Sequence, residues 1–588
     1  MERSPAMGID FGTSKICMSV FKDGNAEIIT SENSESTIPS FVAFDGENKL
    51  FGNEAKNKMR ENPTNVIYNI KRLIGYCFND ISFQEHKKFL PFEIINSDRP
   101  KIQISNNNEI KQYYIEEIIA FEFQKLKQIA SNYLKQNVKD VVVGVPAYFN
   151  SLQRQIIRDS VFISGLHLLR MTSEPTLAAL YYEMNNINNG KKEETVLIFD
   201  FGAGFLSIGL YVLEDGLTEV KAYTGNNHIG GEDLDNRIME YCLGKFGQND
   251  FDIKQNTKAL RKLKKECEKA KKILSSTDKV TIEIEEFYNG EDLSIEITRE
   301  IFEDICSDIF KTIITCLDNV LRDAKITKEK IEQIFIIGGS SNIPKVQSIL
   351  KDYFNGKQLN KSLNSQETVA LGAAIEAAIM TGVRDEKIEK VVLLDANNFS
   401  LGIETVGGVM TVLIPRNSSI PCKKTDILVT YEDNQTFLKV NVYEGERQLV
   451  KDNLLIEQFI LEGIPQLPRG QAQIWITCDV DANYNITVEA EEKSSGVKNK
   501  KFILIQKGRL SKENIEKLKL EFEQEEEKES SEFKAKQKLK NYCLKLNQNI
   551  PDIQLKINQI LLWIENNPEA SEEEINLKRQ ELNDLFKE

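Results

Sequence analysis

The chain has 588 residues, of which 41% are hydrophobic and 28% charged, a composition that is ordinary for a globular protein of several domains. Its 75 basic and 90 acidic residues give a formal net charge of −15, which argues against nucleic acid as a partner because phosphate neutralisation needs a basic surface. No apolar run approaches the roughly 18 residues of a membrane span, and nine scattered cysteines without a Cys-x-x-Cys pair argue against a disulfide scaffold or a zinc ribbon. Together with a polar start and no retention signal, these features predict a cytoplasmic protein.

Alternating strands and helices are predicted for residues 1–388. Short, almost wholly apolar segments that end in Gly or Asp are typical of strands buried on both faces of an α/β sheet. Between them lie helical stretches at 115–134 and 260–274, the second of which is dense in Lys and Glu. The clearest strands are 141–143, 196–199 and 334–337.

The pattern changes twice in the last third of the chain. A compact apolar segment that ends in Asp395 follows a charged stretch, and residues 389–396 are predicted to be a linker. Residues 397–507 then alternate apolar and polar side chains with period two, which predicts a strand-rich domain. Residues 508–588 have no glycine after the first position and are rich in Glu and Lys, which predicts a small helical domain. The acidic run 523–529 fits either helix or disorder, and helix is favoured.

One internal repeat carries most of the predicted chemistry. Residues 8–13 (Gly-Ile-Asp-Phe-Gly-Thr) resemble 198–203 (Ile-Phe-Asp-Phe-Gly-Ala), and 338–340 (Gly-Gly-Ser) form a third glycine turn. Glycines let backbone N–H groups approach phosphate oxygens, and paired Asp carboxylates can hold the hydration shell of Mg²⁺. The repeat therefore predicts two similar halves that face a nucleotide-binding cleft. A Walker phosphate loop is excluded, since 12–15 (Gly-Thr-Ser-Lys) lacks the glycine that precedes Lys there.

Several further motifs follow one another in the order of a known family. They are 8–13, 71–75 (Lys-Arg-Leu-Ile-Gly), 145–150 (Val-Pro-Ala-Tyr-Phe-Asn), 174–176 (Glu-Pro-Thr), 230–233 (Gly-Gly-Glu-Asp), 355–357 (Asn-Gly-Lys), 400–405 (Ser-Leu-Gly-Ile-Glu-Thr) and 432–435 (Glu-Asp-Asn-Gln). In this order the chain resembles the 70-kDa heat-shock chaperone (DnaK-like) family from about residue 7 to its C-terminal region. The resemblance implies an α/β actin-like nucleotide-binding domain of two similar lobes (1–388), an interdomain linker (389–396), a β-sandwich peptide-binding domain (397–507) and a shortened α-helical lid (508–588).

The resemblance also implies an ATPase site that binds ATP or ADP and Mg²⁺, with K⁺ as a further candidate cation. Lys71 would stabilise the charge that develops during phosphoryl transfer, and Glu174 and Asp200 would position the attacking water. Asp10 and Asp200 would hold Mg²⁺ through water. The implied catalytic residues are Lys71, Glu174, Asp200, Asp10 and Thr13. The implied nucleotide-binding residues are Gly12, Thr13, Gly202, Gly204, Gly230, Glu268, Lys271, Ser275 and Gly339.

The second glycine loop departs from the family pattern. The family's Asp-Leu-Gly-Gly-Gly-Thr-Phe-Asp reads here Asp-Phe-Gly-Ala-Gly-Phe-Leu-Ser, so Phe205 replaces a phosphate-binding Thr and Ser207 replaces an Asp near the cations. Ala203 also lacks the freedom of glycine to adopt a positive φ, if the loop needs it there. We expect weaker nucleotide binding, weaker hydrolysis or both, and a slow ATPase is favoured over an inactive one. Outside this loop the replacements are Lys15 for a Tyr, with positive charge where a monovalent cation would otherwise sit, and Lys272 and Asn342 for the arginines that sandwich adenine.

The remaining implied roles concern communication and peptide binding. The linker would dock by edge pairing in one state and be exposed in another, and the sandwich would hold an extended peptide with an apolar pocket for a Leu-like side chain. The implied coupling residues are Pro146, Arg154, Arg170, Leu393, Leu394 and Asp395. The implied peptide-binding residues are Ile403, Val406, Leu428, Tyr431, Leu438, Val440 and Ile474, about half of which would be sandwich core in either case.

The sequence therefore predicts an ATP-dependent chaperone of the stress response that grips extended hydrophobic segments, with slow hydrolysis controlling grip and release. Its expected partners are unfolded or client polypeptides, a J-domain co-chaperone and a nucleotide-exchange factor. The acidic Glu-Glu-Val-Asp tail of the family is absent, so no tail-reading co-chaperone is expected. The alternative is a catalytically weakened, chaperone-derived subunit that acts as a scaffold or fixed-partner component of an assembly. An actin-like sugar kinase would leave residues 397–507 unexplained.

Overall fold

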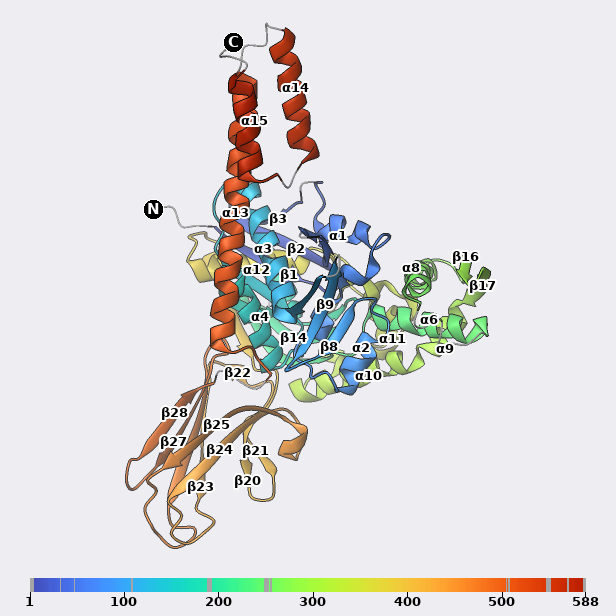
Figure 1. Cartoon of the computed structure of the whole chain (residues 1–588). Helices are drawn as coiled ribbons and strands as arrows, with labels where there is room; N and C mark the ends of the chain where they lie inside the picture. Colours follow the sequence, from blue (N-terminus) through green and yellow to red (C-terminus); the bar gives the residue numbers. More distant parts are fainter. Residues whose placement is uncertain are drawn as a thin grey trace. The chain divides into compact units, whose positions relative to one another are not determined.

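The computed structural model describes residues 5–31, 33–46, 48–106, 109–187, 193–247, 253, 256–503, 505, 508–545, 551–567 and 570–584. These residues divide into two compact units (Figure 1). The first unit is residues 1–162 with 166–511, and the second is 163–165 with 512–588.

The first half of the large unit is built on a mixed sheet. Its strands, in the order β12-β11-β1-β2-β3 with β4 also paired to β2, are β12 (His167–Ser173), β11 (Asp140–Val145), β1 (Ala6–Phe11), β2 (Lys15–Lys22), β3 (Asn25–Ile29) and β4 (Thr37–Pro39). Strand β1 pairs antiparallel with β2 and parallel with β11. The helices of this half are α3 (Ile115–Leu134), α4 (Ser151–Ile163), α5 (Glu174–Asn186) and α12 (Thr368–Thr381). Gly8 lets α12 lie directly on β1, because a Cβ there would be 2.3 Å from the Ala374 nitrogen.

A second sheet repeats this plan. Its strands, in the order β18-β13-β14-β15-β19-β22, are β18 (Gln333–Ile337), β13 (Glu194–Phe201), β14 (Leu206–Glu214), β15 (Leu217–Asn226), β19 (Val392–Ala396) and β22 (Ser419–Ile420). Strand β13 pairs antiparallel with β14 and parallel with β18, just as β1 pairs with β2 and β11. The predicted duplication is therefore a repeated hairpin-plus-parallel-strand unit. Its helices are α6 (Gly231–Phe246), α8 (Thr257–Ile273), α9 (Arg299–Ile305), α10 (Ser307–Ala324) and α11 (Pro344–Tyr353).

Smaller sheets and single turns extend the two halves. The hairpin β16 (Lys279–Tyr288) and β17 (Glu291–Thr298) lies beside α8 (Figure 1, green). Two three-stranded sheets have the orders β6-β5-β7 and β10-β9-β8. Their strands are β5 (Phe41–Asp45), β6 (Asn48–Phe51), β7 (Val66–Tyr68), β8 (Glu93–Asn96), β9 (Pro100–Asn106) and β10 (Glu109–Tyr114), and the short helices nearby in sequence are α1 (Gly52–Lys58) and α2 (Ile81–Lys87). The short 3₁₀ turns of the two halves are η1 (Pro63–Asn65), η2 (Ile70–Leu73), η3 (Lys328–Lys330), η4 (Gly339–Asn342) and η5 (Ile388–Lys390), and η6 (Val450–Asp452) belongs to the strand-rich region that follows.

The period-two region forms two four-stranded antiparallel sheets. One has the order β21-β20-β24-β25 and the other the order β23-β26-β27-β28. Alternate residues such as Val440 and Val442 on β24, and Ile474 and Ile476 on β26, are buried, as expected for strands with one face on a core. The strands are β20 (Leu401–Thr405), β21 (Val409–Ile414), β23 (Cys422–Val429), β24 (Phe437–Glu444), β25 (Leu454–Glu462), β26 (Gln473–Val480), β27 (Ile486–Glu492) and β28 (Lys498–Phe502).

The second unit is helical, as predicted. It contains α13 (Lys512–Lys545), α14 (Pro551–Asn566) and α15 (Glu572–Asp584), and Leu539, Ile557 and Leu582 belong to its own apolar core. The acidic run 523–529 lies inside α13, so the helical prediction is confirmed over disorder. Residues 546–550, 568–569 and 585–588 of the predicted lid lie outside the described residues. None of the helices in the described parts of the chain combines the length and the apolar composition that a membrane crossing requires.

Candidate active site

The two related hairpins meet at a cavity of about 320 Å³. The loop after β1, the loop after β13 and the glycine turn after β18 all line it, as the internal repeat predicted. Twelve of the residues that the sequence assigned to the site line this one cavity: Asp10, Gly12, Thr13, Lys71, Glu174, Asp200, Gly202, Gly204, Glu268, Lys271, Ser275 and Gly339. Gly230 is not among the lining residues, and its neighbour Gly231 is.

Backbone hydrogen bonds close the second glycine loop and join it to the start of α6. The Gly202 N–H donates to the Phe205 carbonyl (3.1 Å), and the Gly231 N–H at the start of α6 donates to the Gly202 carbonyl (3.0 Å). Gly230 is needed beneath the loop, because a Cβ there would lie 2.3 Å from the Ala203 carbonyl oxygen. Ala203 does not have a positive φ, so the loop does not need a glycine at that position.

The two glycine loops also touch each other. A Cβ on Gly204 would lie 2.5 Å from the Thr13 Oγ1 atom, and Thr13 is itself buried. Only a glycine at 204 lets the second loop come this close to the first. The cavity floor is therefore built from both halves of the repeat.

Lys71 and three carboxylates form the charged centre of the cavity. Lys71 lies in η2 and is only 2% exposed, and its Nζ atom is 2.6 Å from Oε1 of Glu174, the first residue of α5. Burial raises the pKa of Asp10 to about 7, with Glu174 adding to the rise and Lys71 opposing it. Burial and the carboxylates of Glu174 and Asp10 raise the pKa of Asp200 well above its usual range. The protein alone thus supplies less positive charge here than three carboxylates require.

This excess of buried negative charge fits a hydrated Mg²⁺ ion. Within the described parts of the chain, no group of three or more His, Cys, Asp or Glu side chains is placed to hold a metal ion directly. Asp10 and Asp200 would instead hold the ion through water and share it with substrate phosphates, which is the usual way that Mg²⁺ binds. Bound there, the ion would supply positive charge to the phosphate oxygens.

The residues of α8 that were predicted to contact adenosine take part in ion pairs. Lys271 Nζ lies 2.7 Å from Oδ2 of buried Asp235 and donates to the Gly231 carbonyl at 2.8 Å, which ties α8 to the start of α6. Lys272 pairs with Glu268 one turn away on the exposed face of the helix. The sequence reasoning missed Asp235, Ser340 and Gln366, which also line the cavity. The glycine turn at 338–340 could have identified Ser340 from the sequence. No local pattern marked Asp235 or Gln366.

The two replaced residues of the second loop differ in their surroundings. Phe205 lines the cavity and is 7% exposed, and its ring meets the Phe149 ring edge-on with a centroid distance of 5.4 Å. Ser207 is buried, and its Oγ accepts a hydrogen bond from the Ala147 backbone N–H at 3.1 Å. Ser207 therefore has a structural partner outside the cavity, while Phe205 forms part of the cavity wall.

Comparisons with known proteins identify the family. The family model described as Hsp70 protein matches residues 6–588. The heat shock 70 kDa protein of Neurospora crassa is 43% identical over 599 residues, covering 98% of this chain and 92% of the relative. The chain belongs to the Hsp70 family. The heat shock cognate 70 kDa protein 3 of Dictyostelium discoideum is 40% identical, covering 99% of this chain and 95% of the relative, and the heat shock 70 kDa protein 2 of Paracoccidioides lutzii is 42% identical.

Membership of the Hsp70 family confirms the predicted fold class and activity. The chain is an ATP-dependent chaperone and an ATPase with ATP or ADP and Mg²⁺ as ligands, built from a two-lobed actin-like domain, a β-sandwich and a helical lid. Members of the family work with client polypeptides, J-domain proteins and nucleotide-exchange factors. Nothing in the comparisons favours the scaffold alternative.

In this Hsp70 chain the segment predicted to be the linker is a strand of the second sheet. Strand β19 pairs parallel with β15, with Val392 opposite Leu217 and Leu394 opposite Glu219. Leu394 is exposed, Leu393 is half-buried, and Asp395 is buried, where its carboxylate lies 3.4 Å from the Arg170 guanidinium. The Tyr223 hydroxyl on β15 donates to the same carboxylate at 2.7 Å.

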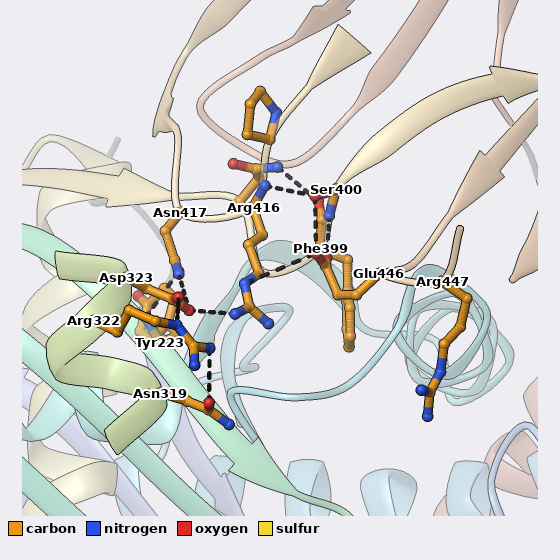
Figure 2. A network of polar contacts seen from close by, with 12 residues as sticks. Tyr223, Asn319, Arg322, Asp323, Phe399, Ser400, Arg416, Asn417, Glu446 and Arg447 are labelled. Atoms are coloured by element: carbon orange, nitrogen blue, oxygen red, sulfur yellow. Dashed lines mark hydrogen bonds and ion pairs between the residues drawn. The ribbon is translucent and has the colours of Figure 1, made fainter. Parts of the chain in front are cut away.

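Polar contacts join the sandwich to both halves of the nucleotide-binding region. The Arg416 guanidinium lies 2.6 Å from Oδ2 of Asp323 on α10 and 3.8 Å from Glu446 (Figure 2). On the other half, the Ser151 hydroxyl and backbone N–H each donate to the Glu444 carboxylate at 2.8 Å. None of these five residues was predicted, since the contacts join residues far apart in the sequence.

The other predicted coupling residues lie at the same boundary. The Arg154 guanidinium lies over the Tyr484 ring of the sandwich at 4.8 Å, and its Nε donates to the Phe149 carbonyl at 3.3 Å. The Pro146 carbonyl accepts a hydrogen bond from the Phe149 N–H at 3.1 Å. Phe149 thus contacts Phe205 in the cavity wall on one side and Arg154 on the other.

The predicted peptide-binding residues fall into three groups. Ile403, Val440 and Ile474 are buried in the sandwich, as expected for those that are also core. Leu428 and Leu438 are half-buried. Val406 and Tyr431 are 79% and 51% exposed. Other apolar side chains exposed on the sandwich are Val412, Ile427, Val429, Phe437, Ile460 and Phe502.

Proposed function

We propose that this Hsp70 hydrolyses ATP slowly and uses the nucleotide to control its grip on extended apolar peptides. ATP binds in the cavity between the two hairpins, with Lys71 next to the terminal phosphate and Asp10 and Asp200 next to the hydrated Mg²⁺. The other residues that line the cavity hold the phosphates and the adenosine in the roles set out above. Peptide binds at the sandwich between Val406 and Tyr431, whose side chains are exposed.

The observation that carries this proposal is the docking of β19 on the edge of β15. The strand connects the nucleotide-binding sheet to the sandwich, and Arg170, Asp395 and Tyr484 join all three parts: Arg170 pairs with Asp395, and the Tyr484 hydroxyl lies 3.4 Å from the same carboxylate. In this proposal the strand has a docked state, held by its pairing with β15 and by these polar contacts, and a released state. A nucleotide that favours the docked or the released state of this strand will therefore change the conformation of the sandwich.

The domain limits, partners and location follow from the same proposal. We assign residues 1–388 to nucleotide binding, 389–396 to the linker, 397–507 to peptide binding and 508–588 to the lid. Client polypeptides, a J-domain protein and a nucleotide-exchange factor would act on this chain as they do on the family. A cytoplasmic location agrees with nine cysteines that are all free thiols.

The test is the dissociation rate of a fluorescein-labelled extended peptide with a central Leu. We expect ATP with Mg²⁺ to speed its release at least about tenfold relative to ADP. In K71A, ATP should still speed release but should be hydrolysed far more slowly than in wild type, since Lys71 acts in the chemical step. In R170Q, hydrolysis should persist while the effect of ATP on release falls. Equal release rates with ATP and ADP in the wild-type protein would defeat the proposed coupling.

A further inference from the structure

The ammonium group of Lys71 is surrounded by aromatic rings. Its Nζ atom lies 5.5 Å from the ring centroid of Phe205, 5.8 Å from that of Phe149 and 5.9 Å from that of Phe11. A cation within about 6 Å of a ring centroid is attracted by the negative face of the ring, and the attraction grows when water is excluded. Lys71 is therefore held by three rings in addition to its ion pair with Glu174.

Phe205 differs from the other two rings in its position. Phe11 and Phe149 are buried beside the cavity without lining it, whereas Phe205 lines the cavity as part of the glycine loop. The loop is closed by the hydrogen bond from Gly202 to the Phe205 carbonyl, and the Phe205 ring rests edge-on against Phe149. The ring thus belongs to the phosphate-binding loop and lies 5.5 Å from the Lys71 ammonium group, so a small movement of the loop or of Lys71 changes this contact.

We propose that Phe205 is a positioning residue that holds Lys71 on Glu174 and thereby slows phosphoryl transfer. To stabilise the charge that develops on the transferred group, Lys71 has to exchange part of its contact with Glu174 and the rings for contact with a phosphate oxygen. Attraction to the Phe205 ring stabilises the resting position and is lost in that exchange, which raises the barrier to the chemical step. The inference deepens the proposed slow ATPase, because it names the residue that sets the rate.

A purely structural role for Phe205 makes a different prediction. If the ring only fills space, its removal leaves a hole in the cavity wall, which lowers stability and weakens nucleotide binding without accelerating hydrolysis. If the ring holds Lys71, removal of its π face accelerates hydrolysis at saturating ATP while the affinity for ATP changes little. The rate of the bound complex therefore separates the two roles.

The experiment compares F205L with wild type in the full-length protein. Leucine keeps an apolar side chain at the site and removes the ring. We expect the single-turnover rate of pre-bound ATP to rise about 3- to 30-fold, as the loss of one desolvated cation–π contact implies, with the ATP dissociation constant within about threefold of wild type. F354L is the matched control, because Phe354 is also a buried ring packed edge-on against an aromatic neighbour, Tyr353, in the second half of the repeat. F354L should not accelerate the reaction.

Repeating the F205L substitution in the K71A variant tests whether the effect of Phe205 depends on Lys71. In K71A there is no ammonium group to hold, so K71A/F205L should hydrolyse ATP no faster than K71A. An unchanged or lower rate in F205L that still folds and binds ATP would overturn the inference, as would acceleration that persists in the K71A background. Failure of wild type to bind or hydrolyse ATP at all would instead overturn the proposed function.

Discussion

The two glycine loops have the same backbone plan and different side chains at the last position. In the first hairpin Phe11 pairs with Ile16, and in the second Phe201 pairs with Leu206, so each loop encloses four residues, 12–15 or 202–205. Asp10 and Asp200 occupy the same place before the loop. The alignment makes Lys15 the counterpart of Phe205.

These counterparts have opposite environments. Lys15 is exposed at the cavity rim, where its Nζ donates to the Gln366 side chain at 3.2 Å, and Phe205 is buried against Phe149 and Lys71. The repeat therefore specifies the turn and the carboxylates in both halves. The fourth loop residue determines whether the loop adds a charge at the cavity rim or an aromatic ring in the cavity wall. Substitutions at paired positions can test how far the two loops share a role.

The largest effect is expected from the paired carboxylates. D10N and D200N should each lower single-turnover hydrolysis at least about 100-fold, because each removes charge that holds Mg²⁺ on the phosphates. Without nucleotide, each substitution should raise the free energy of unfolding by about 1 kcal/mol, because it relieves repulsion among buried carboxylates. Rapid-quench kinetics and urea denaturation measure the two quantities.

In this prediction the hydrolysis rate falls while the free energy of unfolding rises, whereas a substitution that only disrupts the fold would lower both. D479N, on the sandwich, is the control and should change neither quantity. If only one of the two active-site variants loses activity, the two loops do not share the metal ion, and Asp10 and Asp200 do not have equivalent roles.

The next effect concerns the close approach of the loops. G204A should lower the free energy of unfolding by about 1–3 kcal/mol, because its Cβ would meet the buried Thr13 side chain at 2.5 Å. G202A in the same loop is the matched control, since the nearest atom to its Cβ would be 3.9 Å away, and it should cost less than about 0.5 kcal/mol. Equal stabilities of the two variants in urea denaturation would show that the loops can separate freely.

The sequence predicted this site well wherever the signal was local. Apolar runs gave the strands, the 115–134 stretch is α3, and the Asp and Gly residues at strand ends meet in one cavity. Contacts between distant segments were not predictable, since no short pattern pairs Asp235 with Lys271 or Arg416 with Asp323. The effect of Ala203 was also uncertain, because its φ depends on how the loop is held by α6.

A smaller effect is expected from the histidines that meet between the two halves. The His86 and His228 rings lie 5.8 Å apart, beside Tyr76, and His86 shares a small cavity with Arg72, Glu232 and Lys264. Burial lowers the pKa of His86 to about 2, and the charges of Arg72 and His228 add to the fall. Because the folded protein resists protonation that the unfolded chain accepts near pH 6.5, this site's contribution to stability is full above pH 6.5 and is lost as the pH falls.

The measurement is the free energy of unfolding of wild type and H86Q between pH 7.5 and pH 5. Below pH 6.5, wild type should lose up to about 1.4 kcal/mol per pH unit more than H86Q, since glutamine does not titrate. Subtracting the two curves removes the titration of Asp10 and the other buried carboxylates. Parallel curves for wild type and H86Q would contradict the prediction.

The smallest effect is expected at Lys15, the counterpart of Phe205. Its ammonium group is exposed at the rim, so K15A should weaken ATP binding only about two- to fivefold in low salt, and the difference should vanish near 0.5 M salt, where exposed charges are screened. Titration calorimetry at low and high salt measures this loss of affinity for ATP.

The same titrations in KCl and in choline chloride measure the cation dependence. If Lys15 replaces a monovalent cation, K15A will bind ATP better in K⁺ than in choline, while wild type will bind ATP equally well in both. A loss of ATP binding beyond about a hundredfold would mean that Lys15 contacts the phosphates directly, and the two loops would then differ in function as well as in side chain.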